Sequence, residues 1–413
     1  MSPSSAHSAP IVAALDIGTT KICAIIGSRD DDGSIRVLGI GAHPSKGLAR
    51  GMVVDFDEAV ESIEKAVSHA EQMAGCVVED VYVGIAGGHM ASFNAAAEIQ
   101  IDNAMRGVDE KDIEAVVELA RRSIDLPKNH EIIQCFREEY FCDGVPIANP
   151  EDRKCHTLRV RCHIVTAAVT SAQNIAHCVQ LAGLRVADLL VESVASAYSA
   201  LNENEKELGV LLIDIGGGTS DLAVYQEGKI RHSSCIPYGG DDITNDIRKA
   251  LKISRFDAEN LKKKSGCSYA RMVQDDEEVE VNEIFKEKRC KVQRRFLAQV
   301  IQARCQEILQ RCLDDVRASE TPFTEISGVV LTGGSSLLGR LPELTERMCG
   351  LTVKIGQPQN IKGMSSIVSS PIYSTGIGLL AYGLKNPPNR ELTGLQLVDK
   401  IKLFFRRLIN WYD

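Results

Sequence analysis

Two stretches of the chain repeat one short pattern, in which an apolar run is interrupted by a sharp, acid-bearing bend. The first is ALDIGTTKICAIIG, over residues 14–27, and the second is LLIDIGGGTSDLAVY, over residues 211–225. A buried strand that stops at glycine and hydroxyl residues and then resumes predicts a β-hairpin. A further strand, a glycine turn with an acid and a helical stretch follow each copy. Because such a unit rarely arises twice by accident, the pattern predicts two similar halves.

The residues of the two bends predict phosphate binding. Glycines let backbone N–H groups converge on an anion, and hydroxyl donors lie beside them at Thr19, Thr20, Thr219 and Ser220. Asp16 and Asp214 would repel phosphate directly, so their presence indicates a divalent cation, with its water shell, between acid and nucleotide. For either bend alone an ordinary hairpin remains the alternative, whereas the pair favours two facing domains.

Length and composition predict a large, divided, globular protein. The chain has 413 residues, which suggests two to four domains. Its net charge of −9 argues against a nucleic-acid partner, since such proteins concentrate positive charge. The 13 cysteines are scattered, without C-x-x-C pairs or zinc spacing, and predict reduced, mostly buried thiols. The first residues lack the basic and apolar regions of a signal peptide, so we expect a cytoplasmic chain.

Two segments depart from the repeated pattern and predict inserted modules. Residues 89–165 alternate strand-like and helical stretches, which predicts a small α+β module. Residues 247–324 are charged and largely helical in pattern, with one long helix predicted over 291–316. After this second module, GVVLTGGSSLL begins at Gly328 as a strand that runs into a glycine turn. It predicts a third nucleotide-type element.

The C-terminal segment predicts a membrane-surface helix. A double proline at residues 387–388 should end the preceding helix and stiffen a short linker over 387–394. At helical spacing over 395–413, one broad face collects the apolar residues Leu397, Val398, Ile401, Phe404, Phe405, Leu408, Ile409, Trp411 and Tyr412. The cations lie at its edges or behind it: Lys400, Lys402, Arg406 and Arg407. This pattern suits the surface of an anionic membrane, whereas the interrupting charges exclude a span. A helix docked on the protein's own core is the alternative.

The order of the motifs DIGTTK, ESVASA, DIGGGTSD, TGGSSL and STGIGLLAYG resembles the actin/Hsp70/sugar-kinase superfamily. Longer stretches resemble the bacterial cell-division family FtsA over essentially the whole chain. They include KGLARGMVVDFDEAVESIEKAVSHAEQMAG, GIAGGHM, IPYGGDDITNDI, DAENLKKKSG and GVVLTGGSSLLGRLPEL. The resemblance implies an α/β, actin-like fold, with two ribonuclease-H-like domains around a nucleotide cleft and an inserted subdomain in each.

The resemblance also implies roles for individual residues around ATP and Mg²⁺. The first phosphate loop matches Asp16, Gly18, Thr19, Thr20 and Lys21, and the second matches Asp214, Gly216, Gly217, Gly218 and Thr219. The adenosine loop matches Gly333, Gly334 and Ser335, and the segment beside ribose and adenine matches Glu259, Lys262 and Lys263. Asp16 and Asp214 would hold Mg²⁺ through water. Asp214 and Glu192 are the catalytic candidates, and the alternative for Glu192 is an acid at a helix start, where the helix dipole favours negative charge.

The resemblance divides the chain into segments. Domain 1 is expected over 1–88 and 166–206, joined again by 378–386, and domain 2 over 207–246 and 325–377. The inserted subdomains are 89–165 and 247–324, and the second is expected above the nucleotide.

The implied function is that of an ATP-binding, actin-like division protein with at most slow ATPase activity. Its implied partners are the C-terminal tail of FtsZ, copies of itself in head-to-tail filaments, the anionic lipid surface and later division proteins. Its expected location is the cytoplasmic face of the inner membrane at the division site, as a peripheral protein. A pilus-assembly relative of FtsA and a small-molecule kinase of the same superfamily are the alternatives.

Overall fold

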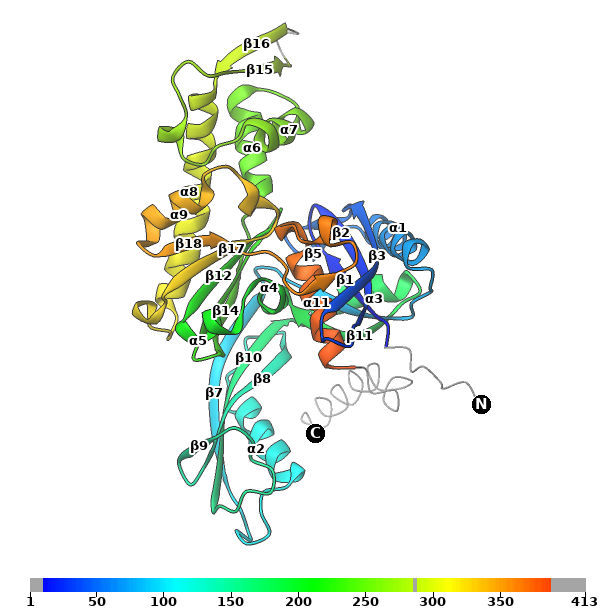
Figure 1. The fold of residues 1–413 in the computed structure, drawn as a ribbon, viewed down its shortest axis with the longest axis vertical. Helices are drawn as coiled ribbons and strands as arrows, with labels where there is room; N and C mark the ends of the chain where they lie inside the picture. Colours follow the sequence, from blue (N-terminus) through cyan, green and yellow to red (C-terminus); the bar gives the residue numbers. More distant parts are fainter. Residues whose placement is uncertain (1–9, 285–287, 388–413) are drawn as a thin grey trace.

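The computed structural model describes residues 10–284 and 288–387. Two sheets lie at the centre of an elongated molecule, and an inserted module projects at each end (Figure 1). No helix within these ranges is long and apolar enough to cross a membrane. The predicted membrane-surface helix, from Leu397 to Tyr412, lies outside the described residues, as does most of the linker before it.

The first sheet is built on the N-terminal repeat. Its strands run in the order β11 (Arg185–Val191), β6 (Asp80–Ile85), β1 (Val12–Ile17), β2 (Lys21–Arg29), β3 (Ile35–Pro44) and β19 (Ile361–Lys362). The predicted hairpin is confirmed, because β1 pairs antiparallel with β2, and β1 also pairs parallel with β6. β19 belongs to a part of the chain far from the other strands, and it pairs with β3.

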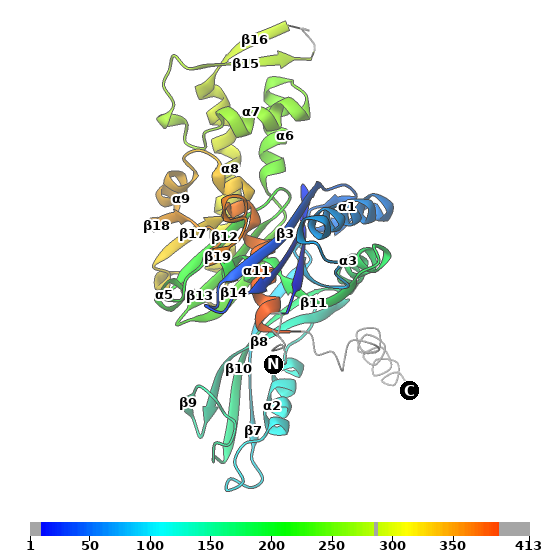
Figure 2. The ribbon, with the colours of Figure 1, turned by 45° about the vertical axis from the view of Figure 1, so that its right-hand side comes forward.

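Helices cover both faces of the first sheet. They are α1 (Phe56–Ala74) and α3 (Val169–Leu181) on the outer face, and α4 (Glu192–Ala200) and α11 (Ser374–Lys385) on the inner face (Figure 2). Along β1, Leu15 packs with the outer pair, whereas Ala14 packs with the inner pair. Coverage on both faces explains why the strands read as continuous apolar runs.

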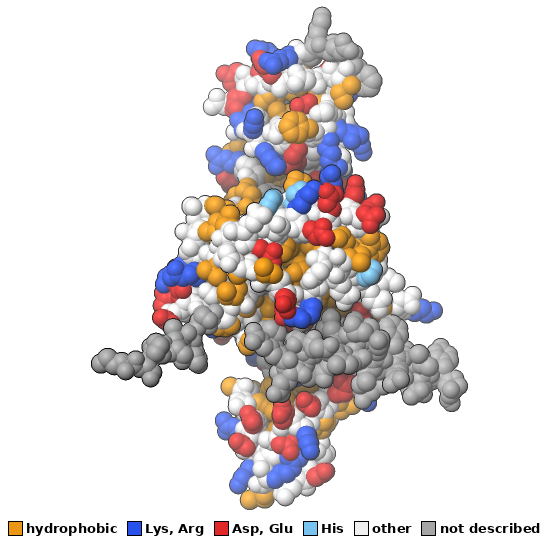
Figure 3. Space-filling model, turned by 90° about the vertical axis from the view of Figure 1, so that its right-hand side faces the viewer, with side chains coloured by type: hydrophobic (Ala, Val, Ile, Leu, Met, Phe, Trp, Pro, Cys, Tyr) orange, Lys and Arg blue, Asp and Glu red, His pale blue; other side chains and the backbone are white. Residues whose placement is uncertain are grey.

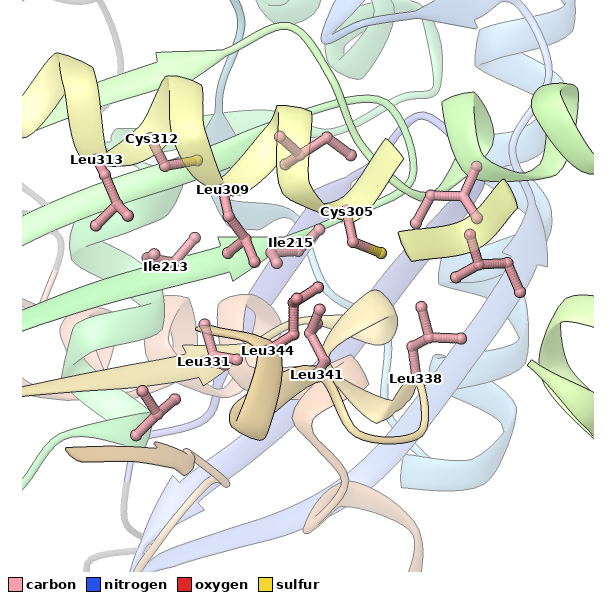
Figure 4. Packing of buried hydrophobic residues seen from close by; sticks show 14 of the residues in the cluster. Ile213, Ile215, Cys305, Leu309, Cys312, Leu313, Leu331, Leu338, Leu341 and Leu344 are labelled. Carbon is pink, nitrogen blue, oxygen red and sulfur yellow. The ribbon is translucent and has the colours of Figure 1, made fainter. Parts of the chain in front are cut away.

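The second sheet repeats the arrangement of the first. Its strands run in the order β14 (Lys229–Ile236), β13 (Ser220–Gln226), β12 (Val210–Ile215), β17 (Gly328–Thr332) and β18 (Thr352–Ile355). One face packs on α6 (Gly240–Leu251), α8 (Arg294–Ala318) and α9 (Leu341–Cys349). Figure 4 shows this core, where Ile213 and Ile215 of β12 meet Cys305 and Leu309 of α8. Residues of α4 share a core with the other face, so α4 lies between the two halves.

The first inserted module is an antiparallel sheet with one helix. The strand order is β7 (Met90–Gln100), β10 (Thr157–Ala168), β8 (His130–Cys142) and β9 (Val145–Ile147), with α2 (Glu110–Arg122) against them. A capping box fixes the start of α2, since the side chains of Asp109 and Asp112 each accept a hydrogen bond from the other's backbone N–H. Acidic and basic side chains are interspersed over this module in Figure 3, as expected of a solvated surface.

The second module departs from its predicted helical pattern. α7 (Arg255–Ser265) and α8 are helical, but β15 (Glu278–Glu283) and β16 (Lys288–Gln293) form an antiparallel hairpin between them. The helix predicted from residue 291 therefore begins at Arg294, and its predicted first turn is strand. Cross-strand pairing is the reason, because Lys291 faces Glu280 across the ladder and ion-pairs with Glu278 beside it.

The remaining elements are short. They are β4 (Leu48–Ala49), β5 (Met52–Val53), α5 (Glu203–Leu208), α10 (Ser365–Val368) and the 3-10 turns Ala270–Met272, Phe323–Glu325, Gly334–Leu337 and Pro371–Tyr373.

Candidate functional site

The two hairpin bends meet face to face at the centre of the molecule. A Cβ atom added to Gly217 would lie 2.3 Å from Cγ2 of Thr20. One added to Gly218 would lie 2.6 Å from the Thr19 hydroxyl oxygen. Glycine is therefore required at both positions of the second bend, because any side chain would collide with the first bend. The structure thus brings together the predicted phosphate loops.

Several backbone amides of the bends have no protein acceptor among the described residues. Each is closed by one equivalent hydrogen bond, from Gly18 N to Lys21 O at 3.1 Å and from Gly216 N to Thr219 O at 2.9 Å. Within the part of the chain that the structure describes, the bends also carry amides that donate to no protein acceptor: Thr19, Thr20, Gly217 and Gly218. Unpaired amides grouped in a turn fit an anionic ligand.

Asp214 is held firmly at the base of the second bend. Its Oδ2 atom accepts hydrogen bonds from the hydroxyls of Ser196, on α4, at 2.5 Å and of Thr375, on α11, at 3.1 Å. Burial raises the pKa of Asp214, and these two hydroxyls oppose the rise. The carboxylate is therefore oriented by two helices that also support the first sheet.

Asp221 is a site residue that the sequence analysis did not single out. It lies directly opposite Asp214 on the hairpin ladder, is 4% exposed and accepts a hydrogen bond from Thr219 at 3.0 Å. Burial first, and the negative charges of Asp214 and Asp16 after it, raise the pKa of Asp221 to about 7. The spacing DIGGGTSD carries the signal for it, because residues paired across a tight antiparallel hairpin point to the same face.

Acidic side chains from both halves cluster beneath the bends. Burial raises the pKa of Asp16 to about 6, with Lys21 opposing and Asp214 adding to the rise. Glu192, the first residue of α4, has a pKa well above its ordinary value because of burial and the nearby charges of Asp16, Asp221 and Asp214. Among the described residues, no group of three or more His, Cys, Asp or Glu side chains is arranged to hold a metal ion directly. The acids Asp16, Asp214, Asp221 and Glu192 thus concentrate negative charge beneath the bends.

Lys21, at the end of the first bend, contacts the segment that precedes α11. Its Nζ atom donates to the carbonyl oxygen of Ile372 at 3.1 Å and lies 4.2 Å from the ring centre of Tyr373. The segment that precedes α11 thus contacts the first bend. This contact joins distant parts of the chain beside the acidic cluster.

The predicted adenosine loop lies against the second bend. Gly333 has φ +81°, and a Cβ atom there would lie 2.2 Å from Oδ1 of Asp214. Ser335 donates from Oγ to the backbone oxygen of Gly216 at 2.9 Å. Gly334, which lies between Gly333 and Ser335 in the chain, begins a 3-10 turn. The close approach requires a glycine at position 333, since no L side chain fits beside the carboxylate.

The charged residues of α7 complete this side of the site. Lys262 ion-pairs with Glu259 at 2.7 Å and donates to Gly240 O, at the start of α6, at 2.9 Å. Lys263 ion-pairs with Glu259 at 3.1 Å. Although burial opposes it, the contacts with Lys262, Thr244 and Lys263 lower the pKa of Glu259 to about 2. The structure therefore brings α7, the adenosine loop and the second phosphate loop together.

Comparison of structures defines the class of protein. The chain matches a PilM–PilN type IV pilus biogenesis complex with a TM-score of 0.64 at 18% identity, covering 90% of this chain and 98% of the other. It also matches MreB5 of Spiroplasma citri bound to ADP, with a TM-score of 0.56 at 17% identity over 93% and 99% of the two chains. The fold is that of the actin-like proteins, as predicted.

Comparison of sequences then gives the family. The model described as cell division protein FtsA matches residues 211–378, and that of the SHS2 domain inserted in FtsA matches residues 87–166. Cell division protein FtsA of Pseudomonas aeruginosa is 39% identical over 92% of this chain and 91% of its own. Cell division protein FtsA of Escherichia coli K12 is 33% identical over 97% of both chains. The chain belongs to the FtsA family of cell division proteins, which confirms the resemblance rather than the pilus or kinase alternatives.

Proposed function

We propose that this chain binds ATP with Mg²⁺ between its two hairpin bends. The unpaired amides of Thr19, Thr20, Gly217 and Gly218 carry the proposal, because they form a donor set for phosphate oxygens. Ser335, Glu259, Lys262 and Lys263 would hold the nucleoside side. The actin-like MreB5 was solved with ADP and with AMPPNP, which supports the same ligand class here.

The buried acids explain why the nucleotide would bring a cation. Asp16, Asp214, Asp221 and Glu192 all have raised pKa values, so their joint negative charge is unfavourable in the protein alone. A hydrated Mg²⁺ supplies compensating positive charge when it is bound with the phosphates. Asp16 and Asp214 would orient its waters. Burial and the nearby acids raise the pKa of Glu192, so its charged form is disfavoured beside Asp16, Asp221 and Asp214.

We further propose that the bound nucleotide supports polymers of this chain that attach FtsZ to the membrane. Membership of a cell division family supports a role at the division site. The C-terminal pattern supports peripheral attachment to the cytoplasmic face of the inner membrane through Phe404, Phe405 and Trp411, with Lys402 and Arg406 at anionic headgroups. The module that carries α7 and α8 would bind the FtsZ tail, and the module at 89–165 would face later division proteins.

Reconstitution on vesicles tests this proposal. The full chain and a version lacking residues 395–413 are sedimented with vesicles containing anionic lipid, together with a peptide of the FtsZ C-terminal tail. We expect the full chain to carry the peptide to the vesicles, and the shortened chain to bind the peptide but stay in solution. As a matched control, Phe404→Tyr keeps the ring and should retain binding, whereas Phe404→Glu should lose it. Equal sedimentation of full and shortened chains contradicts membrane attachment, and failure of both to bind the peptide contradicts the FtsZ role.

A further inference from the structure

Two thiols come into contact within the first inserted module. Cys142 is the last residue of β8, Cys155 lies two residues before β10, and their Sγ atoms are 2.9 Å apart. Both cysteines are free. A disulfide bond is about 2.05 Å long, so the two sulfurs need to close by only about 0.9 Å. We propose that Cys142 and Cys155 form a reversible disulfide when the protein meets hydrogen peroxide.

Backbone hydrogen bonds hold both thiols in place. Asp143, next to Cys142, accepts at Oδ1 from the amides of His156 and Thr157, each at 2.9 Å, and its own amide donates to Thr157 O at 3.1 Å. On the other side of Cys155, Arg153 O accepts from Val108 N at 2.8 Å. The residues that flank Cys155 are therefore anchored on both sides. Such positioning raises the effective concentration of one thiol at the other.

The environments of the two thiols assign their order of reaction. Cys142 is partly exposed, whereas Cys155 is 2% exposed, so peroxide reaches Cys142 first. Burial and the contact with Cys142, with smaller contributions from Asp143 and Asp112, raise the pKa of Cys155 to about 12. Cys155 therefore stays a protonated thiol at neutral pH and is the resolving partner.

The chemistry balances with peroxide as the oxidant. The Cys142 sulfur takes one oxygen of hydrogen peroxide as the O–O bond breaks, which leaves a sulfenic acid and releases water. The Cys155 sulfur then forms the S–S bond as the S–O bond breaks, and the thiol proton leaves with the hydroxyl as a second water. Each sulfur loses one electron overall, and the peroxide accepts both electrons and becomes two molecules of water. Excess thiol reverses the reaction by exchange.

A second pair of thiols in the same core offers a competing reaction. Cys135 lies on β8 and Cys162 on β10, and their thiols are close enough to influence each other's pKa. On the ladder, however, Cys162 faces Arg137, two residues from Cys135. Such diagonal neighbours have Cα atoms about 7–8 Å apart, beyond the usual disulfide range of about 4.4–6.8 Å. Cys155 precedes its strand, so it is free of the ladder that separates the other pair.

Peptide mapping of the full chain tests the proposal. Native protein is treated with hydrogen peroxide, its remaining thiols are blocked in denaturant, and it is digested with trypsin without reduction. We expect a disulfide-linked pair of peptides, residues 138–153 with Cys142 and residues 155–159 with Cys155. Its mass should be lower by two hydrogen atoms than the summed masses of the two peptides with free thiols. The number of free thiols should fall from 13 to 11 and return to 13 with dithiothreitol.

Single variants separate this bond from general oxidation. Cys142→Ser and Cys155→Ser should each lose the linked peptide, whereas Cys178→Ser, in α3, should keep it. If either serine variant fails to fold, the map of the unsubstituted chain still decides. A link between residues 129–137 and 162–185 in place of the expected one would overturn the proposal, as would peroxide oxidation of Cys142 that stops without a disulfide.

Discussion

The two halves of the molecule share a strand order but differ at the residue opposite the acid. The first runs β11-β6-β1-β2-β3 and the second β18-β17-β12-β13-β14, with matching parallel and antiparallel pairs. In the first hairpin Asp16 faces Cys23, whereas in the second Asp214 faces Asp221. A thiol in one half and a carboxylate in the other, at the same place, show that one scaffold carries unequal charge. The second hairpin therefore carries one more buried carboxyl group than the first, and with it more unfavourable desolvation and charge repulsion.

The halves also differ in where the chain has been extended. The first module leaves after β6 and returns before α3, whereas the second leaves after α6 and returns before β17. The turn after β6 therefore leads away through Gly87 to the module. The turn after β17 stays at the site through Gly333 and Ser335. The place of an insertion thus decides which half keeps this turn against the bends.

The largest expected change in stability concerns Gly333, in the turn after β17. Gly333→Ala would place a methyl group against the Asp214 carboxylate at φ +81°, and we expect a loss of about 3–5 kcal/mol in the free energy of unfolding. Gly350→Ala is the matched control, because it has φ +74° with open space around it and should lose only about 1–2 kcal/mol. Urea unfolding measures both.

The first half supplies a second comparison for this turn. Gly87→Ala, at φ +143°, would meet the ring of His89, whereas Gly333→Ala also meets the backbone oxygen of Ile215 at 2.7 Å, so the loss at Gly87 should be the smaller of the two. Equal losses for Gly333→Ala and Gly350→Ala would contradict the close packing of Gly333 on Asp214.

A smaller effect should appear in the pH dependence of stability. The pKa of Asp221 rises from 3.8 to about 7 on folding, so the native state keeps a proton that the unfolded chain releases. The metal-free protein should therefore lose stability as pH rises from about 4 to about 7, by on the order of 3 kcal/mol from this residue. Asp221→Asn should flatten that slope in urea unfolding. Cys23→Ser, at the matching position of the first half, should leave it unchanged, and a slope equally steep in Asp221→Asn would refute the assignment.

The smallest expected effect is on ligand affinity. Asp214→Asn and Asp16→Asn each remove one charge that would face hydrated Mg²⁺, so each should weaken ATP binding in Mg²⁺ by on the order of tenfold, or about 1.4 kcal/mol. Calorimetric titration with and without EDTA measures this change, and the loss should vanish when Mg²⁺ is removed. Thr345→Ser, a conservative change at a buried hydroxyl on α9, serves as the folded control. Unchanged affinity in Asp214→Asn would mean that the second phosphate loop is misassigned.

The sequence predicted the repeated hairpins because their signal is local. An unbroken apolar strand on each side of an Asp-Ile-Gly bend leaves little choice of structure. The β15–β16 hairpin was missed, because Lys291–Gln293 have helix-compatible side chains and only their pairing with distant residues makes them strand.

The candidate site shows the same limit. The residue spacing was enough to predict the two bends. It could not predict that Ser196 and Thr375 donate hydrogen bonds to Asp214, because these contacts join residues up to 161 positions apart. The partner of Lys21 was equally invisible, since Ile372 lies 351 positions away. Such contacts follow from the docking of helices between the sheets, which no local pattern records.

The flush contact between the two bends bears on how tightly any ligand can be held. With Thr20 against Gly217 and Thr19 against Gly218, the bends are in direct contact, so a ligand placed between these residues would need the halves to move apart. Entry then depends on the fraction of molecules whose halves have rotated apart, and the measured dissociation constant equals the intrinsic one divided by that fraction. The measured dissociation constant therefore depends on how readily the two halves separate. Changes in α4 or in the segment before α11, which contact the bends through Ser196 and Ile372, would alter the measured dissociation constant.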